Sequence, residues 1–156
     1  MDAPRRRAHP WTMLLRTGYT LLEIAIVLTI AAIILLLAVP TLARGRDALA
    51  VRSARSDLAN AVALARSTAI VAGGAQVIIN APAATVTVQT ASGAVTRDTL
   101  FLRTMYGVTV ESDGAVPTVL RFDALGIGRL ANATVRVRRG GQMAALTVSS
   151  YGRVKL

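Results

Sequence analysis

Glu23 is the one acidic residue inside a long apolar stretch, and it is the first residue with a candidate function. The stretch from Tyr19 to Val39 has 21 residues. As a helix it spans roughly 31 Å, which matches the hydrocarbon core of a bilayer. An ionised carboxylate near the centre of such a helix costs about 2.5–3.5 kcal/mol on insertion scales, and less near an end. We therefore expect Glu23 to have a partner.

Conventional catalytic groups are scarce in this sequence. It has no cysteine, and its one histidine, His9, precedes the apolar stretch. Serine, threonine and carboxylate side chains are left without a base positioned to activate them. The group Glu111-Ser112-Asp113-Gly114 has two carboxylates, whereas calcium takes about six to eight oxygen ligands, so we interpret this group as a solvated hairpin. We expect no enzyme, no catalytic residue, no cofactor and no metal site.

Basic residues gather toward the C-terminal end. The formal net charge is +10, and no acidic residue follows Asp123. Val135 and Val137 alternate with Arg136 and Arg138, which predicts a strand with one buried and one charged face. The charged face is either a solvated surface or a binding surface for a polyanion or an acidic partner. The candidate nucleic-acid-binding residues are Arg136, Arg138, Arg139, Arg153 and Lys155.

Residues 1–18 are expected to form a leader that is removed. They are rich in arginine and lack the apolar run of a secretory signal, and Met13 offers an alternative start. The leader has four arginines and one aspartate, a net charge of +3, so removing it leaves +7. Basic residues before the span favour a cytoplasmic N-terminus, with the following domain on the other side of the membrane.

The elements that position these residues follow from the periodicity. Residues 19–39 are expected to form a transmembrane helix. Residues 40–72 continue as an amphipathic helix to about Val71, ended by Ala72-Gly73-Gly74. Its apolar residues recur at three- and four-residue steps. They are Val51, Ala54, Leu58, Ala61 or Val62, Ala65 and Ala69.

Residues 73–156 are expected to form a β-rich head, because the period becomes two and β-branched residues dominate. The Leu100–Tyr106 stretch is ambiguous. The predicted strands are Gln76–Asn80, Thr85–Gln89, Val108–Glu111, Val119–Phe122, Thr134–Arg138 and Ala145–Ser149. The predicted fold class is α+β, with a long N-terminal helix, transmembrane in its first half and amphipathic in its second, packed on a small, mainly antiparallel β-sheet head.

The leader and helix also carry a family resemblance. Gly18 ends a basic leader, and Tyr19-Thr20-Leu21-Leu22-Glu23 opens the apolar helix. This arrangement resembles the class III signal of the type IV pilin and type II secretion pseudopilin superfamily. Similarity to H-type minor pseudopilins and FimT-like minor pilins continues in three looser stretches. These are Leu64–Ile70, Phe122–Gly126 and Leu146–Lys155.

The resemblance implies specific roles for the residues at the front of the helix. A prepilin peptidase would cut between Gly18 and Tyr19 on the cytoplasmic side and N-methylate Tyr19. Glu23 would act in filament assembly by pairing with the N-terminal amine of a neighbouring subunit. Two costly buried charges compensate each other only when the neighbour is in register, so this pair would make assembly specific.

The resemblance also implies a function and a location. The expected protein is a minor pseudopilin of a type II secretion system, a structural subunit of the pseudopilus that helps to export folded proteins. It would cross the inner membrane once, with its head in the periplasm and other pseudopilins or pilins as partners. The alternative is a FimT-like minor pilin of a type IV pilus that binds DNA, because Gly152-Arg153-Val154-Lys155 resembles the Gly-Arg-x-Arg ending of such pilins.

Overall fold

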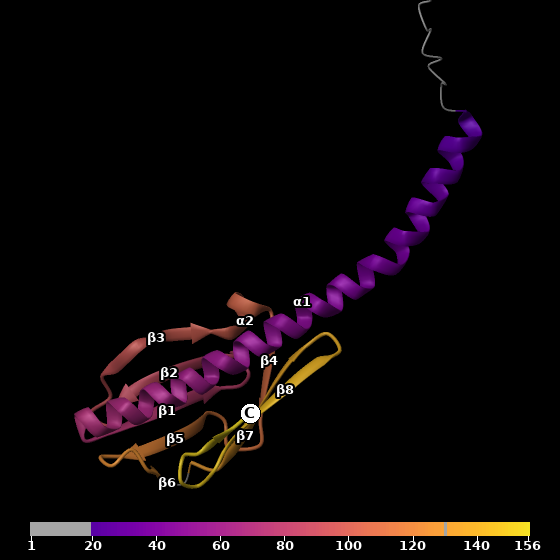
Figure 1. Cartoon of the computed structure of the whole chain (residues 1–156). Coiled ribbons are helices and arrows are strands. Elements are labelled where there is room, and N and C mark those ends of the chain that lie inside the picture. Colours follow the sequence, from indigo (N-terminus) through magenta and orange to yellow (C-terminus); the bar gives the residue numbers. More distant parts are fainter. Residues whose placement is uncertain (1–19, 130) are drawn as a thin grey trace, which may run out of the picture. The chain divides into compact units, whose positions relative to one another are not determined.

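The computed structural model describes residues 20–129 and 131–156, and the chain divides into two compact units, Met1–Ala38 and Val39–Leu156. The predicted cleavage residues Gly18 and Tyr19 lie outside the described residues. Helix α1 runs from Leu21 to Ala72, which is within one residue of the predicted end (Figure 1). Gly73 follows it with φ of +77°, the left-handed conformation that commonly ends helices.

The first unit contains the apolar part of α1. An 18-residue window of the helix reaches a mean hydropathy of 2.9, and none of that window is buried in the protein. Large apolar side chains stand open along it, among them Leu28 (63% exposed) and Leu35 (61%). Exposing these apolar side chains to water costs a free energy of roughly 25 cal/mol for each Å² of apolar surface. This part of α1 is therefore a candidate membrane anchor by length and composition.

The second unit, Val39–Leu156, is called the head unit here, and the rest of α1 supplies one side of its core. The buried helix residues match the predicted apolar face at every position, with Ala61 and Val62 both buried. They are Val51, Ala54, Leu58, Ala61, Val62, Ala65 and Ala69. These side chains belong to one hydrophobic cluster with buried strand residues such as Val77, Leu120 and Leu146. Four of the seven are alanines, which let the helix backbone approach the sheets closely.

The described strands confirm the predicted positions and add three more. The observed strands are β1 (Gly74–Asn80), β2 (Thr85–Thr90), β3 (Val95–Phe101), β4 (Thr109–Ser112), β5 (Thr118–Asp123), β6 (Gly128–Arg129), β7 (Ala133–Arg139), β8 (Gln142–Val148) and β9 (Val154–Lys155). β3, β6 and β9 were not predicted. The last two have two residues each, which is too short for a period to show.

The strands of the head unit form two sheets, a division that the sequence did not predict. The five-stranded sheet has the order β3-β2-β1-β5-β6, and the four-stranded sheet has the order β4-β7-β8-β9. All of the pairings are antiparallel, as expected. β1 pairs with β2 next to it in sequence, but also with β5 about 40 residues later, with Val77 opposite both Val88 and Leu120. The long helix on antiparallel sheets confirms the α+β class.

The prediction of a hairpin at Glu111–Gly114 is wrong. β4 ends at Ser112 in the four-stranded sheet, and β5 begins at Thr118 in the five-stranded sheet, so the segment between them is a crossover. An Asp-Gly pair signals a turn in the chain, but it does not determine which strands then pair.

The ambiguous stretch Leu100–Tyr106 contains the end of β3 and the short helix α2 (Leu102–Tyr106). The sequence of β3, Val-Thr-Arg-Asp-Thr-Leu-Phe, has two charged residues at its centre, which is typical of an edge strand and obscures its period. In α2, Leu102 is fully buried and Gly107 ends the helix with φ of +64°.

Candidate assembly site and basic groove

Glu23 lies in the first turn of α1. Thr20 caps this turn: its Oγ1 accepts a hydrogen bond from the backbone N–H of Glu23 at 3.2 Å, and its carbonyl accepts one from Ile24. The spacing Thr-x-x-Glu is the sequence signature of a capping box, so the capping role of Thr20 could have been read from the sequence. The Glu23 side chain is exposed, and within residues 20–129 and 131–156 it has no ion-pair partner.

Three of the candidate nucleic-acid-binding residues lie on β7 and are occupied by carboxylates of the same chain. Arg136 forms a two-pronged pair with Asp113, in which Nη2 lies 3.1 Å from Oδ2. This hydrogen bond and the charge of Asp113 raise the pKa of Arg136. The other two pairs are Arg138 with Glu111 at 3.6 Å and Arg139 with Asp47 at 2.9 Å.

The other two candidates, Arg153 and Lys155, lie on or beside β9 and are exposed. Within the described residues neither side chain has a hydrogen-bond or ion-pair partner. The turn before them is held by backbone hydrogen bonds from Ser149 to Arg153 and from Gly152 to Ser149. The structure thus separates the predicted basic set into three paired residues and two free ones.

Gly152, the glycine of the Gly-Arg-x-Lys motif, has a structural explanation. Its φ is +77°, and a Cβ at this position would lie 2.7 Å from Cε1 of Phe122. A side chain would be both conformationally strained and too close to the core. Gly152 therefore positions the C-terminal strand and needs no ligand to account for it.

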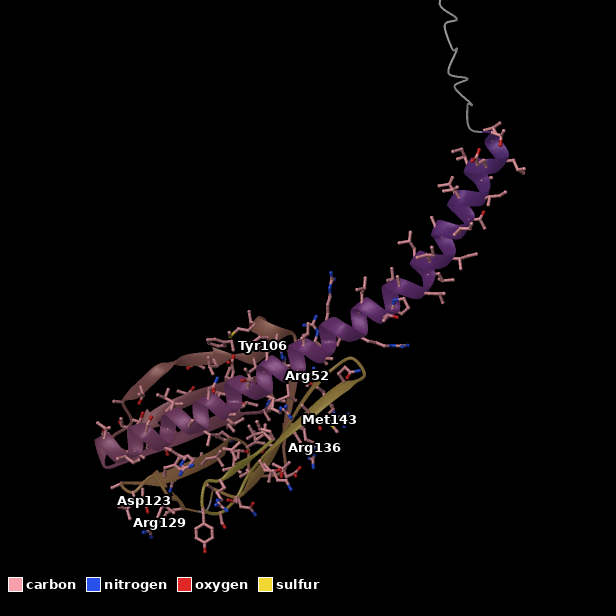
Figure 2. The ribbon with its side chains drawn as sticks, viewed as in Figure 1. Arg52, Tyr106, Asp123, Arg129, Arg136 and Met143 are labelled. Carbon is pink, nitrogen blue, oxygen red and sulfur yellow. The ribbon has the colours of Figure 1, made fainter. Side chains whose placement is uncertain are left out.

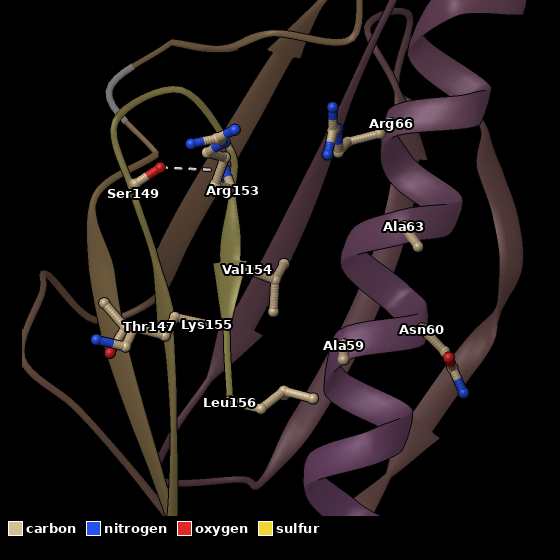
Figure 3. Close-up of a pocket in the computed structure, with 10 residues that line it drawn as sticks. All are labelled: Ala59, Asn60, Ala63, Arg66, Thr147, Ser149, Arg153, Val154, Lys155 and Leu156. Atoms are coloured by element: carbon tan, nitrogen blue, oxygen red, sulfur yellow. Dashed lines mark hydrogen bonds between the residues drawn. The ribbon is translucent and has the colours of Figure 1, made fainter.

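Arg153 and Lys155 line a hollow between the end of the chain and α1 (Figure 3). Its volume is about 890 Å³, and α1 contributes Ala59, Asn60, Ala63 and Arg66. A second hollow, of about 530 Å³, is lined by Arg52 and Arg55 of α1 and by Gln142–Ala145. Leu156 lines both. We call the two together the basic groove.

Asp123, in the family-like Phe122–Gly126 stretch, organises the turn between β5 and β6. Its Oδ1 accepts hydrogen bonds at 3.0 Å from the N–H groups of Leu125 and Ile127, and Oδ2 lies 3.2 Å from Nε of Arg129 (Figure 2). The hydrogen bond from Ile127 is the largest cause that lowers the pKa of Asp123. This residue has a local structural role that sequence reasoning did not assign.

Groups of three histidine, cysteine or acidic side chains that could hold a metal are absent from the part of the chain that the structure describes. Tyr106 donates a hydrogen bond of 2.6 Å to Asp57, which fastens α2 to α1 and raises the pKa of the phenol. Tyr106 and Asp57 therefore have a structural role, which is to hold α2 against α1.

Comparison with solved structures identifies the fold. Two crystal structures of the type IV minor pilin FimU from Pseudomonas aeruginosa strain PAO1 are similar to this chain, with TM-scores of 0.54 and 0.51 and 22% sequence identity in both cases. The first match covers 68% of this chain and 87% of that one, and the second covers 67% and 90%. The chain has the fold of a type IV minor pilin.

In this fold α1 has two parts, of which the first is apolar and unburied and the second supplies core residues. No protein-family model and no curated protein matches the sequence. Because the sequence identity to FimU is 22%, the likeness establishes the fold alone, and the role of the chain is a matter for proposal.

Proposed function

We propose that this chain is a minor structural subunit of a pilin-type filament, anchored in the inner membrane with its head unit in the periplasm. The observation that carries this proposal is α1, a single helix that is apolar and unburied in its first part and supplies core residues in its second. A subunit built this way can pack its apolar part among neighbouring subunits after it leaves the lipid. Its partners are other pilins or pseudopilins.

Maturation is part of the same proposal. Cleavage between Gly18 and Tyr19 by a prepilin peptidase, followed by N-methylation, would leave Tyr19 as the first residue. Glu23 would then lie four residues from that amine, and a neighbouring subunit shifted along the filament could supply the countercharge. Mass spectrometry of the N-terminus tests this: a methylated Tyr19 is expected, and an intact leader on assembled protein would contradict it.

The assembly role of Glu23 is tested by Glu23→Ala with a photo-crosslinker placed at Ala32, in the apolar part of α1. The variant keeps the backbone hydrogen bond to Thr20, so the helix start is preserved. We expect normal membrane insertion and loss of crosslinks to neighbouring subunits. The matched control is Glu111→Ala, which removes an exposed carboxylate on β4 and should leave the crosslinks unchanged. Undiminished crosslinking in Glu23→Ala would show that the carboxylate is dispensable.

For the type of filament, our first proposal is a type II secretion pseudopilus. The resemblance of Leu64–Ile70, Phe122–Gly126 and Leu146–Lys155 to H-type minor pseudopilins supports it. In the bacterium that encodes the chain, deletion of the gene should leave folded secretion substrates in the periplasm, and expression of the intact chain should restore export. Normal export with loss of surface pili would overturn this choice in favour of a type IV pilus.

The second candidate is a FimT-like minor pilin of a type IV pilus that binds DNA. The observation in its favour is that Arg153 and Lys155 are exposed and unpaired within the described residues. Binding to duplex DNA should be independent of sequence, and log affinity should fall with log salt by about 0.9 for each phosphate neutralised. Changing both residues to alanine should make that slope shallower by about two units. An unchanged slope would exclude these residues as phosphate contacts.

A further inference from the structure

Among the described residues, the basic groove is lined by five cationic residues and by no acidic residue. Arg52, Arg55 and Arg66 line it from α1, and Arg153 and Lys155 line it from the C-terminal end. Arg66 is tied to the carbonyl of Gly126 at 3.1 Å, whereas the other four have no partner within the described residues. So many uncompensated cations along one hollow attract a polyanionic partner.

The floor of the groove between these charges is small and apolar. Ala59 and Ala63 lie four residues apart on α1, so they share a face. Arg52, Arg55 and Arg66 lie on the same face, because three- and four-residue steps connect them to these alanines. Val154 and Leu156 face them across the hollow (Figure 3). A floor of methyl groups leaves room for alternate apolar side chains of an extended chain.

One wall of the groove is an open strand edge. β9 pairs with β8 on one side and ends the four-stranded sheet. The carbonyl of Arg153 accepts a hydrogen bond from Ser149, so in the alternating antiparallel pattern Arg153 and Lys155 point their backbone groups toward β8. The N–H and C=O of Val154 therefore point away from β8, where an added strand could pair with them.

We propose that the basic groove binds an extended, acidic segment of a different polypeptide, which pairs with the free edge of β9, places its apolar side chains over the alanine floor and places its carboxylates beside Arg153 and Lys155. This inference concerns the head unit and does not depend on the type of filament. Backbone pairing with an edge strand supplies affinity, and the side chains on either side supply specificity.

A second copy of this chain does not fit as the occupant. All five carboxylates that the structure describes between Val39 and Leu156 already have partners in their own chain. The pairs are Asp47 with Arg139, Asp57 with Tyr106, Glu111 with Arg138, Asp113 with Arg136, and Asp123 with Arg129. Two copies would bring unpaired arginines together, and the carboxylates described here are already engaged, so a segment of another protein is the better occupant.

Single-stranded nucleic acid fits the groove less well than an acidic peptide. Proteins that bind single strands place bases on aromatic side chains, and the lining residues include no aromatic residue. Phosphates could contact the rim, but they would use neither the alanine floor nor the free edge of β9.

The test uses the full chain in a non-ionic detergent and fluorescence anisotropy with labelled peptides. The acidic probe is an eight-residue peptide of alternating glutamate and valine, and the control probe has lysine in place of glutamate. We expect the acidic probe to bind and the lysine probe not to bind. Absence of binding by the acidic probe at physiological salt would overturn the proposal.

Two sets of variants locate the binding. Arg153→Glu with Lys155→Glu should weaken binding by about tenfold or more, because two attractions become repulsions. The charge-matched control, Arg46→Glu with Arg121→Glu, changes two exposed arginines outside the groove and should bind as wild type does. Equal effects of the two double variants would show only a general charge effect and would refute the groove as the site.

A final comparison separates an inserted peptide from a polyanion on the rim. Ala63→Leu keeps every cation and fills the exposed floor, so it should abolish binding of the acidic peptide. Peptides N-methylated at alternate residues should lose binding in one register and keep it in the other. If Ala63→Leu has no effect and a poly-thymidine oligonucleotide binds more tightly than the peptide, the groove is a nucleic-acid surface and the proposal fails.

Discussion

Individual residues in the head unit show how local geometry and charge hold the C-terminal region in place. Gly152 occupies a left-handed conformation directly against Phe122, and Asp123 gathers two backbone N–H groups and Arg129 at the neighbouring turn. Both residues lie in stretches that resemble minor pseudopilins and pilins. Both residues make structural contacts. The resemblance in these stretches can therefore be explained by the fold, without a ligand.

Gly152→Ala should destabilise the head unit strongly. A left-handed conformation costs a non-glycine residue about 1–2 kcal/mol, and the clash with Phe122 should add about 1–3 kcal/mol of overpacking. Gly73→Ala isolates the first cost, because Gly73 has φ of +77° and open space around it. Gly141→Ala carries neither cost. Urea unfolding followed by circular dichroism should rank the losses as Gly152, then Gly73, then Gly141, and equal losses at Gly152 and Gly73 would contradict the clash.

Asp123 should make the head unit sensitive to acid. Its pKa is lowered in the folded chain, so the carboxylate favours folding above its unfolded pKa of about 3.9. That contribution is lost as the pH falls through the lower, native pKa. Asp123→Asn should be less stable than wild type near neutral pH, and the gap in unfolding midpoint should close in acid. A gap that does not change with pH would mean that the charge is unimportant.

At the scale of elements, α1 is the surface on which the rest of the head unit assembles. Its alanine-rich face is buried against the sheets, and its flanks hold other parts through polar contacts. Asp57 holds α2 through Tyr106, and Asp47 holds β7 through Arg139. The helix therefore combines close packing with a few directional contacts that fix the register of its neighbours.

Tyr106→Phe should weaken the attachment of α2 to α1. The hydrogen bond of 2.6 Å to Asp57 would be lost, at a cost of about 1 kcal/mol for a partly exposed pair. The native pKa of Tyr106 is raised, so the wild type should lose this contribution as the pH rises above about 10. A double-mutant cycle with Asp57→Asn measures the pair directly. Additive effects of the two changes would show that the contact contributes nothing.

At the scale of the whole molecule, the charges and the apolar surface are arranged for two separate contacts. The unburied apolar part of α1 fits a membrane or the apolar core of a filament. In the head unit the described carboxylates are paired within the chain, while Arg52 and Arg55 on α1 and Arg153 and Lys155 near the C-terminal end have no partner within the described residues. The first part of α1 thus presents an apolar surface, and the head unit presents a cationic one.

The proposed membrane role of α1 predicts a position-dependent effect of charge. Ile30→Arg with Ile34→Arg should release the chain from the membrane, since each arginine near the centre of a span costs about 2.5–3.5 kcal/mol on insertion scales. The control Ile70→Arg with Val71→Arg also adds two charges at exposed positions of α1, but within the head unit. Alkaline extraction should free the first variant and leave the control in the membrane pellet. Identical extraction of the two would argue against a span at residues 21–39.

The helix and most of the strands could be predicted from the sequence, because these elements depend on patterns between near neighbours. The apolar spacing along α1 predicted every residue on its buried face, and alternation located six strands within a few residues. Glu23 and the basic C-terminal residues were also found from residue types alone. Periodicity follows from the geometry of the backbone, so it can be read without knowing what each element packs against.

The contacts between distant segments could be seen only in the tertiary structure. It divided the strands between two sheets, made the segment 113–117 a crossover between them, and paired Arg136, Arg138 and Arg139 with carboxylates elsewhere in the chain. It also brought Arg52 and Arg55 to the same groove as Leu156, about a hundred residues later. Such contacts follow from how all the apolar faces are buried together, and no local pattern encodes that choice.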